Sequence, residues 1–251
     1  MRFIRRIYSI YGSIGFIMAF LILLPKFIYT IEVPGKKSQG RKLNRIWSKL
    51  FFGMLFFKVK IENRNHLKES EQFIFVSNHF SYLDIPVLGL IPFDLVFIGK
   101  SSLAKVPLFG YMFKNLHIAV DRNSLKSRGE SMLKAKKALD EGASVVFFPE
   151  GGISSEAPPA MARFKDGAFK LALDKQIPII PVTLSYNHLI LPDDGKFLLR
   201  YKPVKVVIHE PITVKGSGPN EVKEIKEKCF AIIQEQLNKD NKPLAFKKEN
   251  S

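Results

Sequence analysis

The sequence predicts an α/β fold with a mostly parallel sheet flanked by helices, preceded by an N-terminal membrane-associated helical segment. Short, continuous apolar runs recur along the chain, and amphipathic helical patterns separate them. Strands that are apolar throughout are typical of parallel sheets covered by helices on both faces. A long uncharged run near the N-terminus predicts the membrane segment. The chain has 251 residues, of which 46% are hydrophobic, enough for one large domain with an appendage.

The first apolar run lies at residues 7–25 and carries no charge. Its 19 residues are just long enough for a helix to cross a hydrocarbon core of ~30 Å. A cleaved signal peptide would need a small-x-small site after the run, and none follows, so we expect an uncleaved anchor. Basic residues flank the run on both sides. The positive-inside rule therefore leaves a single span and insertion into one leaflet both open.

A second apolar pattern, at residues 43–55, repeats at helical spacing with basic residues off the stripe and Trp47 near its start. This pattern is typical of an amphipathic helix lying in the membrane interface. The run at 51–57 is apolar on all sides, which favours contact with lipid. The alternative is an ordinary helix packed on the protein core.

The net charge of +16 is concentrated near the N-terminus. Residues 1–50 hold ten Lys/Arg and one acidic residue, so they carry 10 − 1 = +9 and the other 201 residues carry +7. A nucleic-acid binder would spread or stripe its charge over the folded domain, so we expect membrane lipids as partners and no nucleic acid. The expected division is a pair of membrane-anchoring helices at 1–57, an α/β domain at 58–240 and a flexible basic tail at 241–251.

From residue 58 onward the chain alternates strand and helix patterns. Apolar runs predict five strands and a later β segment, at 73–77, 95–98, 118–120, 144–148, 179–184 and 197–208. Helical patterns lie at 85–90, 101–114, 125–141, 167–175 and 220–237. The single cysteine, Cys229, excludes a disulfide framework and a multi-cysteine metal site. Histidines and carboxylates are not clustered either, so no metal site is predicted.

Polar residues follow the strand ends in a fixed order. They are Asn78, His79 and Asp84 after the first strand, Lys100 after the second, Arg122 after the third, and Glu150, Gly151 and Gly152 after the fourth. Carboxyl ends of parallel strands share one sheet edge, so these residues are expected to converge. A histidine beside a carboxylate makes a general base, because the carboxylate fixes the tautomer and stabilises the imidazolium. Residues five apart on a helix point about 140° away from each other, so His79 must lie in the turn before the helix and Asp84 within it.

Taken in order, these motifs resemble the glycerolipid acyltransferase family, and within it the bacterial 1-acylglycerol-3-phosphate acyltransferases. The resemblance covers residues 70–210 and rests on NHxxxxD, a lysine, a strand ending in arginine, FPEG and a proline-containing strand. It implies a membrane-bound enzyme that moves a fatty acyl group from a thioester to the sn-2 hydroxyl of 1-acylglycerol-3-phosphate (lysophosphatidate), giving phosphatidate. No cofactor is implied, and the donor is either acyl-CoA or acyl carrier protein. Such donors place the catalytic part on the cytoplasmic side of a bacterial inner membrane.

The resemblance also implies roles for individual residues. His79 is the general base and Asp84 orients it, whereas the other predicted site residues bind substrate: Asn78, Lys100, Arg122, Glu150, Gly151, Gly152 and Lys165. Among these, Lys100 and Arg122 would bind the acceptor's phosphate and Glu150 its glycerol. The two glycines allow a tight turn with backbone N–H groups aimed into the site.

The chain departs from the family pattern at one position. The pattern commonly reads FPEGTR, whereas here Gly152-Ile153 follows the first glycine, so the arginine is absent. Arg163 or Lys165 is a candidate replacement. Alternatively the acceptor lacks a phosphate, as in a lyso-amino-acid (ornithine-type) lipid. A non-enzymatic protein that coats anionic membrane would explain the N-terminal charge but not the ordered strand-end residues.

Overall fold

A computed structural model of the protein describes residues 2–63, 67–68, 71–153, 158–216 and 218–242. Most of the expected tail at 241–251 therefore lies outside the described residues. The strands form a seven-stranded sheet: β1 (Val59–Glu62), β2 (Ile74–Ser77), β3 (Leu95–Lys100), β4 (Ile118–Val120), β5 (Ser144–Phe147), β6 (Ile179–Leu184) and β7 (Val204–Ile208). The helices are α1 (Arg2–Glu32), α2 (Lys37–Met54), α3 (Asp84–Leu88), α4 (Phe109–Leu116), α5 (Leu125–Asp140), α6 (Gly167–Lys175), α7 (Asn187–Ile190) and α8 (Pro219–Asp240), with a 3-10 helix, η1 (Ser101–Lys105).

The strand order is β1-β7-β6-β2-β5-β3-β4, and every neighbouring pair is parallel except β6 with β7. The predicted mostly parallel sheet is therefore confirmed. The central strands β2, β5 and β6 are buried along their whole length, which explains why they read as continuous apolar runs. The carboxyl ends of β2, β3, β4 and β5 share one edge, as the sequence predicts.

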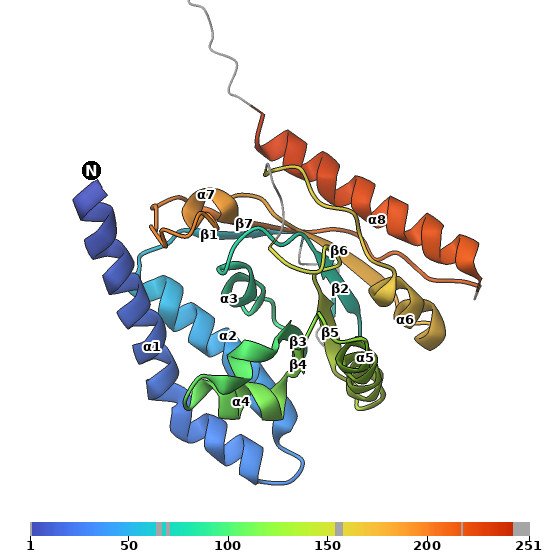
Figure 1. Cartoon of the computed structure of the whole chain (residues 1–251), viewed down its shortest axis with the longest axis horizontal. Coiled ribbons are helices and arrows are strands. Elements are labelled where there is room, and N and C mark those ends of the chain that lie inside the picture. The colour runs from blue at the N-terminus through green and yellow to red at the C-terminus, as the bar shows by residue number, and fades with distance from the viewer. Residues whose placement is uncertain (1, 64–66, 69–70, 154–157, 217, 243–251) are drawn as a thin grey trace, which may run out of the picture.

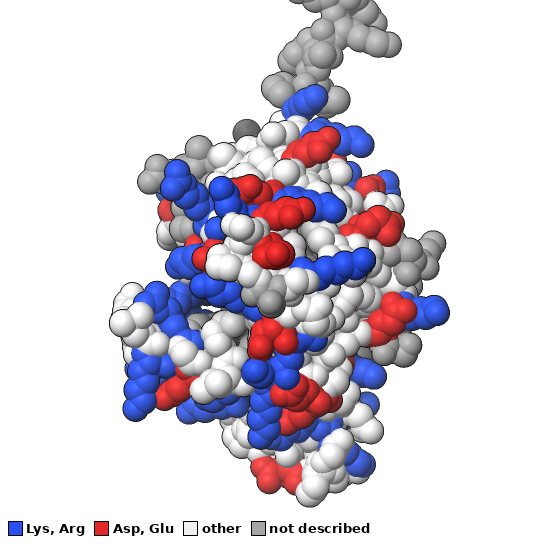
Figure 2. Space-filling model, turned by 90° about the vertical axis from the view of Figure 1, so that its right-hand side faces the viewer, with Lys and Arg blue, Asp and Glu red and all other residues white. Residues whose placement is uncertain are grey.

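Helices cover both faces of the sheet, and each face has its own hydrophobic core (Figure 1). Strand β2 shows the division, because Phe75 packs with α1, α2 and α3 whereas Ile74 and Val76 pack with α5, α6 and α8. On the second face, Lys and Arg are interspersed with Asp and Glu (Figure 2). Ion pairs such as Lys136–Asp174, at 2.7 Å, join α5 to α6 there. This part of the surface is mixed in sign rather than uniformly basic.

The N-terminal helix α1 includes the predicted run and continues beyond it on both sides. Its stretch Phe3–Glu32 is apolar and long enough to cross a membrane by length and composition, and 28% of its most apolar window is buried. Ile7, Ile10 and Ile14 of this helix are each more than half exposed. The inner side packs on α2 (Figure 1).

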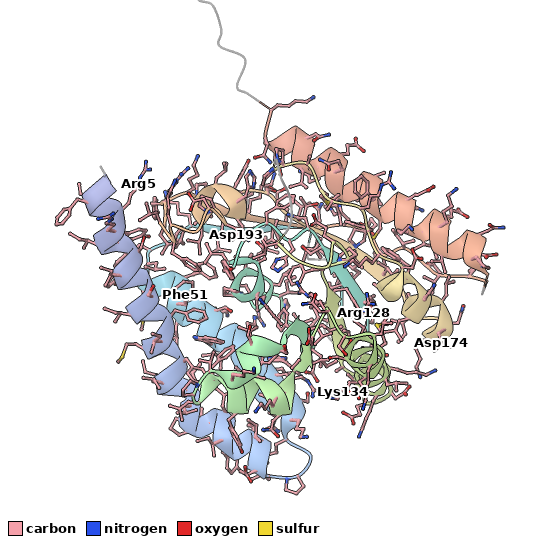
Figure 3. The ribbon with its side chains drawn as sticks, in the orientation of Figure 1. Arg5, Phe51, Arg128, Lys134, Asp174 and Asp193 are labelled. Carbon is pink, nitrogen blue, oxygen red and sulfur yellow. The ribbon has the colours of Figure 1, made fainter. Side chains whose placement is uncertain are left out.

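The expectation that residues 51–57 face lipid is wrong. Phe51, Phe52 and Leu55 are at most 3% exposed and belong to the core that α2 shares with α1 and the sheet. Phe51 lies where α1 and α2 face each other (Figure 3). Phe56, by contrast, is 79% exposed. An amphipathic stripe indicates that an apolar partner covers that face of the helix. A protein core and a lipid bilayer favour the same pattern, so the stripe does not distinguish the two partners.

Three other elements differ from the sequence prediction. The helix expected at 101–114 is broken into η1 and α4, since Pro107 cannot donate a backbone hydrogen bond and Leu108 takes a positive φ of 59°. The β segment expected at 197–208 is reduced to β7, because Phe197 has a positive φ of 49° and Pro203 immediately precedes the strand. Strand β1 was not predicted, since its four residues are partly or fully exposed and alternate in polarity.

Candidate active site

The turn between β2 and α3 brings His79 and Asp84 into contact. His79 lies in the turn and Asp84 is the first residue of α3, as their spacing requires. The His79 Nδ1 atom lies 2.9 Å from Asp84 Oδ2. The imidazole is 6% exposed and stacks on Phe148, with ring centroids 4.0 Å apart. This leaves Nε2 as the ring nitrogen available to a substrate.

Asp84 is completely buried and its carboxylate accepts four hydrogen bonds. Oδ2 accepts from His79 and from the backbone N–H groups of Phe80 and Ser81, at 2.8 and 2.9 Å. Oδ1 accepts from the Asn187 side chain at 2.8 Å. Burial of a carboxylate is unfavourable unless hydrogen-bond donors surround it, and the turn supplies three of the four donors.

Two predicted substrate-binding residues instead hold the backbone of the site together. The Asn78 side-chain amide donates to the carbonyl of Leu184 at 3.2 Å, and its oxygen accepts from the Leu184 N–H at 2.9 Å. This residue is fully buried and ties the end of β2 to the end of β6. Glu150 accepts from the backbone N–H groups of His79, at 2.8 Å, and Ala162, at 2.9 Å. Burial raises the pKa of the Glu150 carboxyl. Both side chains are therefore placed to position the site.

His79 opens onto a cavity of about 1060 Å³ between the sheet edge and the N-terminal helices. Its polar wall includes four of the predicted site residues, namely His79, Lys100, Arg122 and Gly152. Its apolar wall comes largely from α1, α2 and α4, and includes Phe16, Phe20, Leu21, Trp47, Phe109 and Met112. Asp193, on the loop after α7, also lines it (Figure 3). One cavity therefore joins a histidine, charged side chains of both signs and a long apolar surface.

The two cations on the wall differ in burial. Lys100 is exposed at the end of β3, whereas Arg122 is half-buried and burial lowers its pKa. Within the described part of the chain, no carboxylate pairs with either side chain. Arg122 Nη1 lies only 3.1 Å from the point that a Cβ on Gly152 would occupy, so a glycine there lets the guanidinium approach the turn. A desolvated, unpaired arginine favours binding of an anion.

Lys165 lies beside the turn after β5, although neither it nor Gly151 lines the cavity. Gly151 has a φ of +86°, and the Lys165 side chain lies directly over its α-carbon, where any Cβ would collide with Nζ. The Lys165 backbone N–H donates to the carbonyl of Pro149 at 2.9 Å, which fixes this approach. Ile153, at the place of the missing arginine, lines the cavity. The structure therefore places a lysine beside the turn that the family pattern would supply with an arginine.

Sequence reasoning missed two neighbours of the His79–Asp84 pair. Phe148, the first residue of the FPEG motif, stacks on the His79 ring. Asn187 contacts Asp84 from 103 residues further along the chain, and no local motif marks it. A contact of that separation depends on the sheet order and could not be read from spacing.

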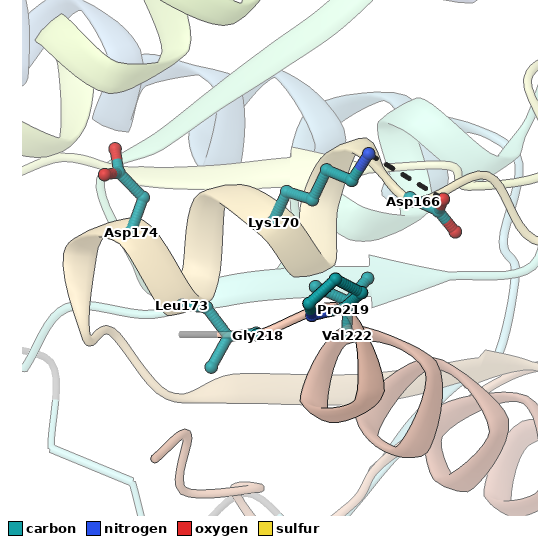
Figure 4. A pocket seen from close by; sticks show the side chains of 7 residues that line it. All are labelled: Asp166, Lys170, Leu173, Asp174, Gly218, Pro219 and Val222. Atoms are coloured by element: carbon teal, nitrogen blue, oxygen red, sulfur yellow. Dashed lines mark ion pairs between the residues drawn. The ribbon is translucent and has the colours of Figure 1, made fainter. Parts of the chain in front are cut away.

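A second, shallower pocket of about 410 Å³ lies between α6 and the start of α8 (Figure 4). Its wall includes Asp166, which pairs with Lys226 at 2.7 Å, and Lys170. None of the predicted site residues lines this pocket. The Asp166–Lys226 pair joins the start of α6 to α8.

Comparisons with known proteins agree with this fold and site. A family model described as Acyltransferase matches residues 58–185, and the chain therefore belongs to the acyltransferase family. The chain is 28% identical to the chloroplastic 1-acyl-sn-glycerol-3-phosphate acyltransferase LPAT1 of Arabidopsis thaliana, over 80% of this chain and 56% of that protein. It is also 28% identical to the 1-acyl-sn-glycerol-3-phosphate acyltransferase of Haemophilus influenzae, over 74% of this chain and 79% of that protein.

The fold is shared with a solved structure. The crystal structure of the 1-acyl-sn-glycerophosphate acyltransferase PlsC from Thermotoga maritima superposes with a TM-score of 0.74 at 20% identity, covering 94% of this chain and 97% of that one. An acyltransferase of Schizosaccharomyces pombe is 31% identical over 76% of this chain and 70% of that protein. The chain spans only 51% to 66% of the length of three plant and algal relatives.

Proposed function

We propose that the protein is a 1-acylglycerol-3-phosphate O-acyltransferase, which acylates the sn-2 hydroxyl of lysophosphatidate to give phosphatidate. The observation that carries this proposal is the His79–Asp84 pair at a cavity that combines the cations Lys100 and Arg122 with a long apolar surface. Lysophosphatidate matches this cavity, because its glycerol hydroxyl lies between an anionic phosphate and an apolar acyl chain. The names of the relatives support the same reaction.

In the proposed reaction, Asp84 holds His79 through Nδ1, and Nε2 takes the proton of the free hydroxyl. The hydroxyl oxygen attacks the thioester carbonyl carbon, and a tetrahedral intermediate forms. Collapse of that intermediate breaks the C–S bond and completes the ester. His79 then returns its proton to the departing thiolate, so the products are an ester and a free thiol. Because the acceptor attacks directly, no protein nucleophile is needed.

The acceptor's phosphate would bind Arg122, Lys100 and Lys165. Arg122 contributes most, since it is half-buried and its fork of N–H groups matches phosphate oxygens. Lys165 is exposed and lies at the turn itself, where it supplies a cation in place of the missing arginine. Gly151 and Gly152 make room for these two cations.

The membrane association of the protein would come from the exposed side of α1. Its apolar residues, together with the N-terminal charge of +9, suit an anionic lipid surface. Thioester donors, whether acyl-CoA or acyl carrier protein, place the site on the cytoplasmic side of a bacterial inner membrane. Both donors are anionic and suit a basic protein. No cofactor enters the reaction.

Ile153 supports a second candidate acceptor. It puts an apolar side chain on the cavity wall where the family pattern has an arginine, which would suit a lysolipid without phosphate, such as a lyso-ornithine lipid. Three cations near the turn favour the phosphate-bearing acceptor. The two candidates differ only in the head group and share the His79 chemistry.

The test is release of free thiol by the purified full chain in detergent, with acyl-CoA or acylated carrier protein as donor. Lysophosphatidate, monoacylglycerol and lyso-ornithine lipid with matched chains would be compared as acceptors. We expect lysophosphatidate to give the highest kcat/KM. Faster turnover of the lyso-ornithine lipid would select the second acceptor, and no turnover with any acceptor and either donor would reject the proposal.

A further inference from the structure

The segment at 184–191 begins at the end of β6, contains α7 and contacts the turn that carries the catalytic pair. Asn78 pairs with the backbone of Leu184, and the Ser81 hydroxyl donates to the carbonyl of Leu191 at 2.7 Å. Between these two contacts, Asn187 donates to Asp84 Oδ1 at 2.8 Å. The segment therefore meets the turn at three points, and the central one reaches the carboxylate itself.

Asn187 makes this contact from a buried position and leaves its own oxygen unpaired. The residue is 1% exposed, and Oδ1 has no hydrogen-bond partner within the described part of the chain. Leaving a buried acceptor unpaired is unfavourable, and native structures contain few such groups. A leucine would fill similar space without that cost. The amide is therefore explained by what its Nδ2 does for Asp84 rather than by packing.

We propose that Asn187 is a positioning residue for the His79–Asp84 pair, an inference that rests on the proposed acyl transfer. Oδ2 of Asp84 is bonded to His79 and to two backbone N–H groups, whereas Asn187 is the partner of Oδ1 in the described structure. By holding Oδ1, Asn187 fixes the rotation of the carboxylate about χ2, so that Oδ2 stays directed at Nδ1. Its N–H also stabilises the carboxylate charge in a site that water does not reach.

The opposite side of the segment is fixed by the end of α8. The Ser185 hydroxyl donates to Asp240 Oδ2 at 2.6 Å, and Asn241 donates to the Ser185 carbonyl at 3.1 Å. Lys205 of β7 pairs with Asp240 at 2.8 Å. These contacts leave Asn187 little freedom to move away from Asp84. The position of the Asn187 amide is therefore set in part by β7 and α8, which are remote from the catalytic turn.

Two substitutions of similar size test the inference, Asn187→Asp and Asn187→Leu. Both remove the donor, and the first also places a second carboxylate beside Asp84. We expect kcat to fall about 10-fold while the KM for lysophosphatidate stays within about 2-fold, since the change affects the base and not the binding of substrate. The acid limb of the kcat/KM profile is expected to move to higher pH by about half a unit, because an unsolvated carboxylate holds the imidazolium proton more strongly. Asn238→Asp makes the same change at an exposed position of α8 and should match the wild type.

An NMR titration of the His79 ring in the same variants separates this inference from the proposed function. Its midpoint should move in the same direction as the acid limb, whether or not any lysolipid is turned over. Folding is checked by circular dichroism and the melting temperature. If both variants are folded and neither kcat nor the ring titration changes, Asn187 has only a structural role and the inference is wrong.

Discussion

Two histidines line the same cavity, but their partners differ. His79 has a buried carboxylate on Nδ1, whereas His117 accepts a hydrogen bond from the backbone N–H of Phe97 at 3.4 Å and has the Asn44 amide 3.1 Å from Nε2. Burial, reinforced by the nearby Arg41, lowers the pKa of His117 to about 3. Near pH 7, His117 is therefore neutral and too weak a base to take a hydroxyl proton.

The comparison shows that the partner, and not burial in the cavity, distinguishes the two rings. A carboxylate stabilises the imidazolium that forms when a base accepts a proton, while an amide and a neighbouring cation do not. The Asn44–His117 contact instead links α2 to the segment before β4. One histidine suits catalysis and the other suits structure, although both are more than nine-tenths buried.

Among the substitutions that test this comparison, Asp84→Asn should reduce turnover the most. Removing the charge leaves His79 without a stabiliser for its cation and favours the wrong tautomer, so we expect kcat to fall about 10³-fold. Asp94→Asn is the matched control, because it changes a carboxylate that binds Arg41 through two hydrogen bonds away from the catalytic pair. That variant should lose stability and retain its turnover. A kcat above one tenth of the wild-type value in Asp84→Asn would show that the carboxylate is dispensable.

Arg122→Ala should have the next largest effect, on binding rather than on chemistry. Losing a charged hydrogen-bond donor to a phosphate should raise the KM for lysophosphatidate about 10-fold to 100-fold. Arg128→Ala, on the exposed side of α5, provides an arginine control (Figure 3). The expected rise is specific to acceptors with a phosphate. An equal rise for monoacylglycerol would mean that Arg122 acts on something other than the head group.

Lys165→Ala should have a smaller effect, because the side chain is exposed and screened by water. We expect the KM for lysophosphatidate to rise about 3-fold. Lys170→Ala removes an exposed lysine from the neighbouring helix and serves as the control. If the two variants have the same KM, Lys165 does not replace the missing arginine.

His117→Gln should change turnover least, by about 2-fold or less, and should act instead on the pH dependence of stability. The folded state holds the pKa of His117 at about 3, below the usual histidine value of 6.5, so the unfolded chain binds more protons between these values. The free energy of unfolding therefore falls as pH decreases through that window, by about 2 kcal/mol at pH 5 from this group alone. Urea unfolding at pH 7.5 and pH 5 measures the difference, which the variant should reduce. Equal losses in the two proteins would contradict this assignment.

The sequence was sufficient for the parts of the site that depend on local geometry. The spacing of His79 and Asp84 lets the pair meet only if His79 lies in the turn and Asp84 in the helix, and the structure has this arrangement. Lys100 and Arg122 were expected at the same sheet edge because their strands are parallel, and both reach the cavity. The sequence left Arg163 and Lys165 as alternative replacements for the missing arginine, and in the structure Lys165 lies over Gly151.

Features that depend on tertiary packing could not be predicted in the same way. Asn187 meets Asp84 only because β6 lies beside β2, and nothing in its local sequence marks it. Glu150 and Asn78 belong to motifs that suggested contact with substrate, but their hydrogen bonds go to backbone groups. The burial of α2 was missed because its apolar stripe is equally compatible with a protein or a lipid neighbour.

The most direct test of the central claim measures thiol release with lysophosphatidate for the wild type, His79→Ala and His117→Gln side by side. The two histidines share a cavity, so a general effect of altering its wall would appear in both variants. We predict that turnover falls at least about 10³-fold in His79→Ala and stays near the wild-type rate in His117→Gln. Turnover by folded His79→Ala within tenfold of the wild type would contradict the assignment of His79 as the base.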